Sequence, residues 1–299
     1  MNRRQLLTGL AGLPLVSSLE RALDAQPASM SPAANKVFHL KAGLVAYSYR
    51  TELAAKTLTY DDVIRTAADW GLDGVDVTVY WFPDTSDKYL AGLRRTAQRC
   101  GVALYNTGVR VQLSQPTKEL QDAQVESIKK WVDVADRLGS SHVRVFGGAI
   151  PKGATQDQAI AWAVEVLKRG AEYSGSKGIT LGVEDDGGLT ATAEPTIAIA
   201  KQTESPWAGI NADSGNLPKN GYAQFETLLP YATSIHFKTE MTDENGKHNP
   251  ADWPRLLNMI AKSGYRGYVG LEYETTNAVA DVPRLCAELR TLIAKVNAG

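Results

Sequence analysis

The chain has 299 residues, of which 43% are hydrophobic and 22% are charged, and its formal net charge is -1. A disordered chain has fewer apolar residues and a larger net charge, so this composition predicts a folded protein. The balanced charge gives no basic excess that would bind a nucleic acid. The length requires one domain and leaves a short surplus at the N-terminus.

The N-terminus carries an export pattern. Arg3 and Arg4 directly precede an apolar, Gly-rich stretch that reaches about Leu19. This order is typical of a twin-arginine signal, although a basic tail by chance is the alternative. The apolar stretch is too short to span a bilayer comfortably, so no stable membrane span is expected. We assign residues 1–25 to a signal peptide, 26–37 to a linker and 38–299 to the folded domain, and we expect a periplasmic or exported protein.

Short apolar runs alternate with helical patterns along the rest of the chain. The apolar runs are bounded by Gly or polar turns, which is typical of buried parallel strands. One run ends at His236, and the other strands are expected at residues 42–48, 74–79, 103–109, 142–147, 179–183, 208–212 and 268–271. Helices are expected at residues 59–70, 87–99, 117–138, 155–177, 192–203, 221–231 and 252–263.

The helical patterns have the spacing and the stop signals of real helices. One apolar stripe with helical spacing consists of Ile160, Ala163, Val164, Leu167 and Ala171. The glycines that suit a left-handed residue at a helix end are Gly71, Gly101, Gly139, Gly178 and Gly264. Strands that alternate with helices require right-handed crossovers and a parallel sheet. Eight such units predict an α/β fold, a single-domain (β/α)8 TIM barrel, whose usual length is about 250 residues.

Four of the expected strands end in residues that bind metals. They are Val183-Glu184, Ala212-Asp213, Ile235-His236 and Leu271-Glu272. The carboxyl ends of barrel strands form the active face, so these side chains should converge. Carboxylates with one imidazole suit one Mn²⁺, Mg²⁺ or Co²⁺ ion more than a structural zinc. A single member could be a solvated carboxylate or a core histidine, but four in register favour a metal site.

The chain resembles the xylose isomerase-like family of TIM barrels, the sugar phosphate isomerases and epimerases, from about Lys41 to Val296. The motifs that carry the resemblance are Gly182-Val183-Glu184-Asp185-Asp186-Gly187-Gly188, Asn211-Ala212-Asp213-Ser214-Gly215-Asn216, Ile235-His236-Phe237-Lys238 and Leu271-Glu272-Tyr273-Glu274. The resemblance implies that Glu184, Asp213, His236 and Glu272 bind a divalent metal. It also implies that the two glutamates face a sugar from opposite sides.

These residue types suit proton transfer next to a carbonyl. A divalent cation can stabilise the enediolate that forms when the proton is removed. Glu184 and Glu272 would then act as the acid–base pair. Lys238 lies two residues after His236, so both should face the barrel mouth. It is expected either to steady the oxyanion or to pair with Glu240 or Glu274.

Further residues are expected to bind the substrate, a small sugar. Aromatic rings stack on sugar rings, while Arg and Asn side chains bind hydroxyls. Tyr47 and Arg50 follow the first strand, Trp81 the second and Asn106 the third, although loop aromatics are also ordinary lids. The remaining candidates are Arg144, Asp186 and Asn216.

Three functions remain open on this evidence. The first is a metal-dependent sugar isomerase or epimerase, and the second is a lyase that acts on 3-keto-glycosides with the same metal site. The third is a non-catalytic sugar-binding barrel. Many relatives have Asn-His where this chain has Asp185-Asp186. Relatives that act as ketose 3-epimerases tend to have a histidine shortly after the strand-six aspartate, where this chain has Ser214-Gly215-Asn216. Both departures count against the epimerisation of free ketoses. A homo-oligomer is compatible with the sequence.

The export signal makes a direct prediction. Because the paired arginines are the part of the signal that is recognised, replacing both Arg3 and Arg4 by Lys should retain the precursor inside the cell. Cell fractionation followed by immunoblotting checks this. Secretion of the double variant at the wild-type level would rule out the twin-arginine assignment.

Overall fold

The computed structural model describes residues 39–299. The predicted signal peptide and linker, residues 1–37, lie outside the described residues, and so does residue 38 at the expected start of the domain. In the described part of the chain, every helix is too short or too polar to cross a membrane.

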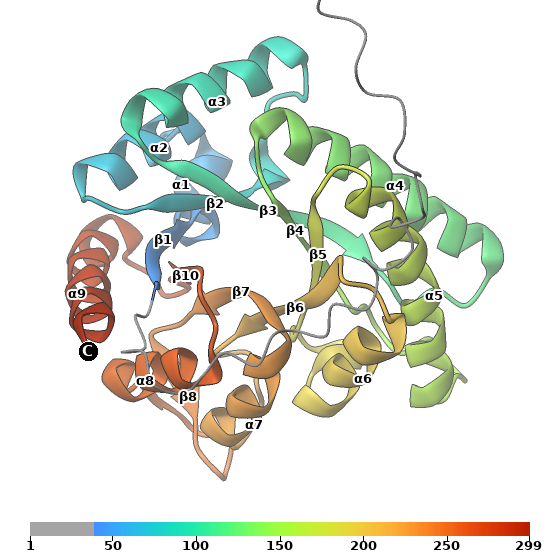
Figure 1. Cartoon of the computed structure of the whole chain (residues 1–299). Helices are drawn as coiled ribbons and strands as arrows, with labels where there is room; N and C mark the ends of the chain where they lie inside the picture. Colours follow the sequence, from blue (N-terminus) through green and yellow to red (C-terminus); the bar gives the residue numbers. More distant parts are fainter. Residues whose placement is uncertain (1–38) are drawn as a thin grey trace, which may run out of the picture. The chain divides into compact units, whose positions relative to one another are not determined.

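Within residues 39–299, eight parallel strands close into a barrel, and helices surround it (Figure 1). The predicted (β/α)8 fold is therefore confirmed. Around the barrel the strands lie in the order β1-β10-β7-β6-β5-β4-β3-β2. Their bounds are β1 Lys41–Val45, β2 Gly74–Thr78, β3 Ala103–Gln112, β4 His142–Phe146, β5 Thr180–Glu184, β6 Ala208–Asp213, β7 Ala232–Phe237 and β10 Tyr268–Leu271.

The predicted helices form close to their expected positions. Their bounds are α2 Tyr60–Asp69, α3 Asp87–Cys100, α4 Lys118–Leu138, α5 Gln156–Gly175, α6 Ala193–Thr203, α7 Gly221–Leu228, α8 Trp253–Ser263 and α9 Ala278–Ala298. Five of these helices have a capping side chain whose oxygen accepts a hydrogen bond from a backbone N–H of the first turn. The capping residues are Thr59, Ser86, Thr117, Thr155 and Asp252. The five predicted stop glycines all have positive φ.

Two segments differ from the prediction. The first strand ends at Val45 rather than residue 48, because a turn η1 (Ala46–Tyr49) and a short helix α1 (Arg50–Ala55) follow it. In η1 the Ser48 hydroxyl donates to the carbonyl of Leu271 (3.2 Å), so its polar group bonds to the neighbouring strand end. Between β7 and α8, where the sequence predicts neither a strand nor a helix, the chain forms an antiparallel hairpin, β8 (Glu240–Thr242) with β9 (His248–Pro250).

A β-bulge in β3 determines what fills the barrel. Val75 pairs with Leu104 and Asp76 pairs with Asn106, so Tyr105 is the extra residue. A bulge lets two successive side chains share one face, and here both Tyr105 and Asn106 face the interior. The Tyr105 ring stacks on Tyr268 with centroids 4.1 Å apart.

Three glycines make room for Tyr105. A Cβ atom would lie 2.9 Å from Tyr105 if added at Gly43, 2.7 Å at Gly74 and 2.2 Å at Gly270. Larger residues would therefore force this ring out of place. The three positions belong to β1, β2 and β10, so the tyrosine fills the barrel interior between these strands.

We expect Gly270→Ala to destabilise the protein by about 1–3 kcal/mol, the usual range for overpacking a core. The new methyl group would clash with the Tyr105 hydroxyl, which is buried without a hydrogen-bond partner. Urea unfolding measures the free-energy change.

Two further variants isolate the cause. Tyr105→Phe removes the clashing oxygen, so it should recover most of the loss in the double variant. Gly92→Ala lies in α3 with no atom within 4 Å of the added Cβ, and it should stabilise by about 0.5–1 kcal/mol. Equal effects of the two alanine substitutions would contradict the packing argument.

Candidate metal centre

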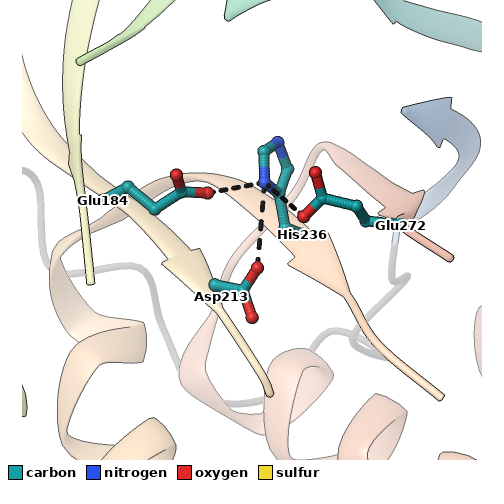
Figure 2. Close-up of side chains that lie close together, drawn as sticks. All are labelled: Glu184, Asp213, His236 and Glu272. Carbon is teal, nitrogen blue, oxygen red and sulfur yellow. Dashed lines mark ion pairs between the residues drawn. The ribbon is translucent and has the colours of Figure 1, made fainter. Parts of the chain in front are cut away.

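Four predicted ligands meet at the carboxyl ends of neighbouring strands. Glu184 ends β5, Asp213 ends β6, His236 lies near the end of β7, and Glu272 follows β10. Each offers one ligand atom, and these atoms all lie within 4.8 Å of one another. Figure 2 shows the two glutamates approaching His236 from opposite sides, with Asp213 completing the group.

The His236 ring is held with one nitrogen facing the carboxylates. Its Nε2 donates to Asp76 Oδ2 at 2.9 Å, because an ionised carboxylate can only accept. Its Nδ1 lies 2.6 Å from Glu184 Oε1 and 3.2 Å from Glu272 Oε2, and it makes no hydrogen bond. An imidazole nitrogen of this kind, opposite a carboxylate-bound N–H, is typical of metal ligands.

Asp213 also has one oxygen held and one free. Its Oδ1 accepts the backbone N–H groups of Gly215 (2.7 Å) and Asn216 (3.1 Å). Its own N–H donates to Asp185 Oδ1 at 2.7 Å, which fixes the strand end. Its Oδ2 is buried without a hydrogen-bond partner and faces His236 Nδ1 at 3.9 Å. The free oxygen is the one that points to the centre.

Each glutamate is oriented by a neighbouring polar group. The Asn211 side-chain amide donates to Glu184 Oε1 at 3.0 Å, and Arg144 Nε lies 3.3 Å from Glu184 Oε2. Lys238 Nζ lies 2.8 Å from Glu272 Oε2. These contacts keep both carboxylates directed at one point.

The site has more buried negative charge than its own cations neutralise. The buried carboxyl groups are Asp76, Glu184, Asp185, Asp213 and Glu272, whereas the buried cationic side chains close to them are Arg144 and Lys238. Isolated buried charge is strongly unfavourable, so the surplus favours either a bound cation or the uptake of protons by the site. A divalent ion fits this donor set of three carboxylates and one imidazole.

The pKa shifts reflect the same surplus. Burial raises the pKa of Asp213 to about 8. Burial alone would lower the pKa of His236, but the carboxylates of Glu272 and Glu184 raise it well above its ordinary value. Without a metal ion, protons are thus drawn to the positions that a cation would take.

A small polar cleft of about 120 Å³ opens above the ligands. Its lining includes several predicted residues: Tyr47, Arg144, Asp186, Asn216 and Lys238, beside Glu184 and Glu272. The sequence assigned no role to two others in the lining, Tyr80 and Phe146, and it named Glu274 only as a possible partner of Lys238. The Tyr80 hydroxyl accepts from Arg144 Nη1 at 2.9 Å, so it helps to position that guanidinium.

Three predicted substrate-binding residues lie elsewhere. Asn106 is fully buried within β3, where its amide donates to Asp76 Oδ2 at 2.6 Å. Arg50 donates to the carbonyl of Tyr273 at 2.9 Å and so holds the loop after β10. Trp81 packs against Tyr47, with ring centroids 5.8 Å apart, and lines a neighbouring hollow. Asn106 and Arg50 bind protein groups because the bulge and η1 place them there.

Lys238 is paired with carboxylates on two sides. Its Nζ lies 2.7 Å from Glu274 Oε2, and this pairing is one of the two alternatives that the sequence analysis offered. It also lies near the carboxylates of Glu272 and Asp213. Burial alone would lower the pKa of Lys238, but the Asp213, Glu272 and Glu274 carboxylates raise it well above its ordinary value. Its ammonium group therefore stays charged.

A buried polar chain supports the centre from below. Asp76 binds both His236 and Asn106, and Asn106 Oδ1 lies 2.7 Å from His142 Nδ1. Burial lowers the pKa of His142 to about 3, so this ring is neutral. One feature of the sequence indicates this buried hydrogen-bonded series. Asp76 lies in the middle of the apolar run Gly74–Thr78, and a buried carboxyl group needs a partner.

Comparison with known families agrees with the fold. The family model described as a xylose isomerase-like TIM barrel matches residues 64–293. The chain therefore belongs to this family, as its sequence motifs indicated. One curated relative, the C-glycoside deglycosidase alpha subunit of Arthrobacter globiformis, is 38% identical over 55 residues, which are 18% of this chain and 15% of the relative.

Solved structures share the fold at low sequence identity. D-psicose 3-epimerase with D-tagatose from Clostridium cellulolyticum H10 has a TM-score of 0.67 and 15% identity, covering 86% of this chain and 98% of its own. The probable 3-DHS dehydratase of Bacillus anthracis has a TM-score of 0.62 and 14% identity, covering 85% and 98%. The zinc-bound IolI protein has a TM-score of 0.67 and 12% identity, covering 86% and 98%.

Asp76 offers a test of metal binding that does not depend on a substrate. Asp76→Asn keeps an oxygen for the His236 N–H but removes the charge that strengthens the imidazole as a ligand. Affinity for Mn²⁺ should fall about 10- to 100-fold, which is typical when such a supporting carboxylate is lost. Titration against a fluorescent chelator measures it. Asp73→Asn, at the opposite end of β2, should leave the affinity unchanged, and a matching loss there would refute the argument.

Proposed function

We propose that this member of the xylose isomerase-like TIM barrel family is a divalent-metal-dependent sugar isomerase or epimerase. One observation carries the proposal: Glu184, Asp213, His236 and Glu272 direct their ligand atoms to a common point at the barrel mouth. The donor set suits Mn²⁺, Mg²⁺ or Co²⁺. A bound cation would hold a sugar hydroxyl and the adjacent carbonyl and stabilise the enediolate charge.

The two glutamates are placed to move the proton. They approach from opposite sides of the centre (Figure 2), so one can take a proton from the carbon next to the carbonyl. The other can return a proton on the opposite face, which would invert that carbon or shift the carbonyl. Arg144 beside Glu184 and Lys238 beside Glu272 keep both carboxylates oriented.

The cleft lining supports a sugar as substrate. Tyr47 and Phe146 offer apolar ring surface, while Asp186 and Asn216 offer hydrogen-bonding groups. Lys238 is the cationic side chain nearest to Glu272 Oε2, so it can steady a developing oxyanion. These roles follow from residue type and position in the cleft.

A lyase that acts on 3-keto-glycosides is the second candidate. It would begin with the same proton abstraction and then expel the glycosidic oxygen. The local likeness to a C-glycoside deglycosidase subunit favours it. Ser214-Gly215-Asn216 also favours it, because ketose 3-epimerases of the family tend to have a histidine shortly after the strand-six aspartate. The proposed export by the twin-arginine pathway also favours it, because phosphorylated sugars are scarce outside the cytoplasm.

Reaction in D₂O tests the proposal and separates the two candidates. We expect metal-loaded protein, given a panel of free ketoses and 3-keto-glycosides, to incorporate deuterium at the carbon next to the carbonyl. Mass spectrometry detects the label, and release of an aglycone would identify a lyase. Binding of a sugar without exchange or product would support a non-catalytic barrel instead.

The same assay tests Glu272 as an acid–base group. Glu272→Gln keeps an oxygen for the ion but cannot carry a proton, so exchange should fall by about 10²- to 10⁴-fold. Metal content, measured by elemental analysis, should fall much less. A variant that retains the ion and exchanges within about threefold of wild type, far below that range, would refute the two-glutamate mechanism.

A further inference from the structure

A second hollow lies at the same end of the barrel as the metal centre. It has a volume of about 530 Å³ and is lined mainly by Leu53, Ala54, Tyr60, Trp81, Phe82 and Tyr89. These residues come from α1, from the turn η2 (Val79–Trp81) after β2, and from the first turns of α2 and α3. Helices that follow barrel strands begin at the carboxyl end, which is the end that carries the metal ligands.

The hollow is aromatic and its rings hold one another in place. The Phe82 ring packs edge-on against Tyr60, with centroids 4.6 Å apart, and against Tyr89 at 5.4 Å. The Tyr60 hydroxyl donates to the carbonyl of Thr78, which anchors this ring to β2. Trp81, Phe82 and Tyr89 are each half-buried, so part of their surface is open to a ligand. A preformed apolar surface of this kind suits a flat, apolar group.

One pair of rings separates the hollow from the cleft. Tyr47 lines the cleft, Trp81 lines the hollow, and their rings lie 5.8 Å apart at an angle of 31°. The cleft holds only about 120 Å³ and is mostly polar. A bulky substituent on a sugar bound there would extend beyond the cleft, and the apolar hollow lies across this aromatic pair.

We propose that the hollow binds the aromatic aglycone of a glycoside whose sugar ring occupies the cleft. This inference rests on the proposed sugar-binding function of the cleft. It names the substrate class as aryl 3-keto-glycosides, which keep a carbonyl for the proposed proton transfer, rather than free sugars. Trp81 is then a specificity residue for the aglycone and not part of the sugar wall.

Calorimetry with two unreactive probes tests the inference. With the metal-loaded protein, 4-nitrophenyl β-D-glucopyranoside should bind at least about tenfold more tightly than methyl β-D-glucopyranoside, since burying one aromatic ring is worth at least that factor. Ala54→Glu places a carboxylate in the hollow at an exposed position of α1, and it should bring the ratio of affinities close to one. Ala55→Glu, exposed on the same helix but outside the lining, should keep the wild-type ratio.

A third probe separates this inference from the proposed function. Free 2-naphthol should bind wild type and Ala55→Glu but not Ala54→Glu. If 2-naphthol behaves in this way while neither glucoside binds, the aromatic site stands and the sugar-binding function fails. Equal affinities for the two glucosides, or no binding of 2-naphthol, would overturn the inference. A change of oligomeric state caused by Ala54→Glu would also overturn it, because the hollow would then be an interface between copies of the chain.

Discussion

Mutual repulsion among buried carboxylates is the constraint on which the rest of the structure depends. Glu184, Asp213 and Glu272 bring their oxygens close to Nδ1 of His236 in a buried part of the barrel. These groups would separate if their backbones could move. The closed sheet prevents that, because each ligand lies at or next to a hydrogen-bonded strand end. The barrel thus supplies the rigidity that a tight cation site requires.

In Asp213 and His236, one polar atom of the side chain makes hydrogen bonds and the other faces the centre. Asp213 Oδ1 accepts two backbone N–H groups, and His236 Nε2 bonds to Asp76. Asp213 Oδ2 and His236 Nδ1 make no hydrogen bond. The motif from Asn211 to Asn216 accordingly does more than supply one ligand. Asn211 holds Glu184, and Ser214 Oγ accepts the N–H of Lys238 at 2.9 Å.

The sequence was sufficient to predict the strands, most helices and the four converging ligands, because these follow from alternating apolar runs and from the common direction of parallel strands. The role of Asn106 could not be predicted, since a one-residue bulge at Tyr105 decides which way its side chain points. The contacts of Arg50 and Trp81 could not be predicted for a related reason. Arg50 binds the carbonyl of Tyr273, which is distant in the sequence, and Trp81 packs against Tyr47 in a way that depends on how the loops pack.

The position of the cleft has a consequence for the order of binding under the proposed function. Tyr105 fills the barrel interior between three glycines, whereas the cleft opens at the carboxyl ends of the strands and is lined by Glu184 and Glu272. A sugar seated in that cleft would stand between a bound ion and the solvent. The ion would then enter first and leave last, and the substrate would slow its exchange.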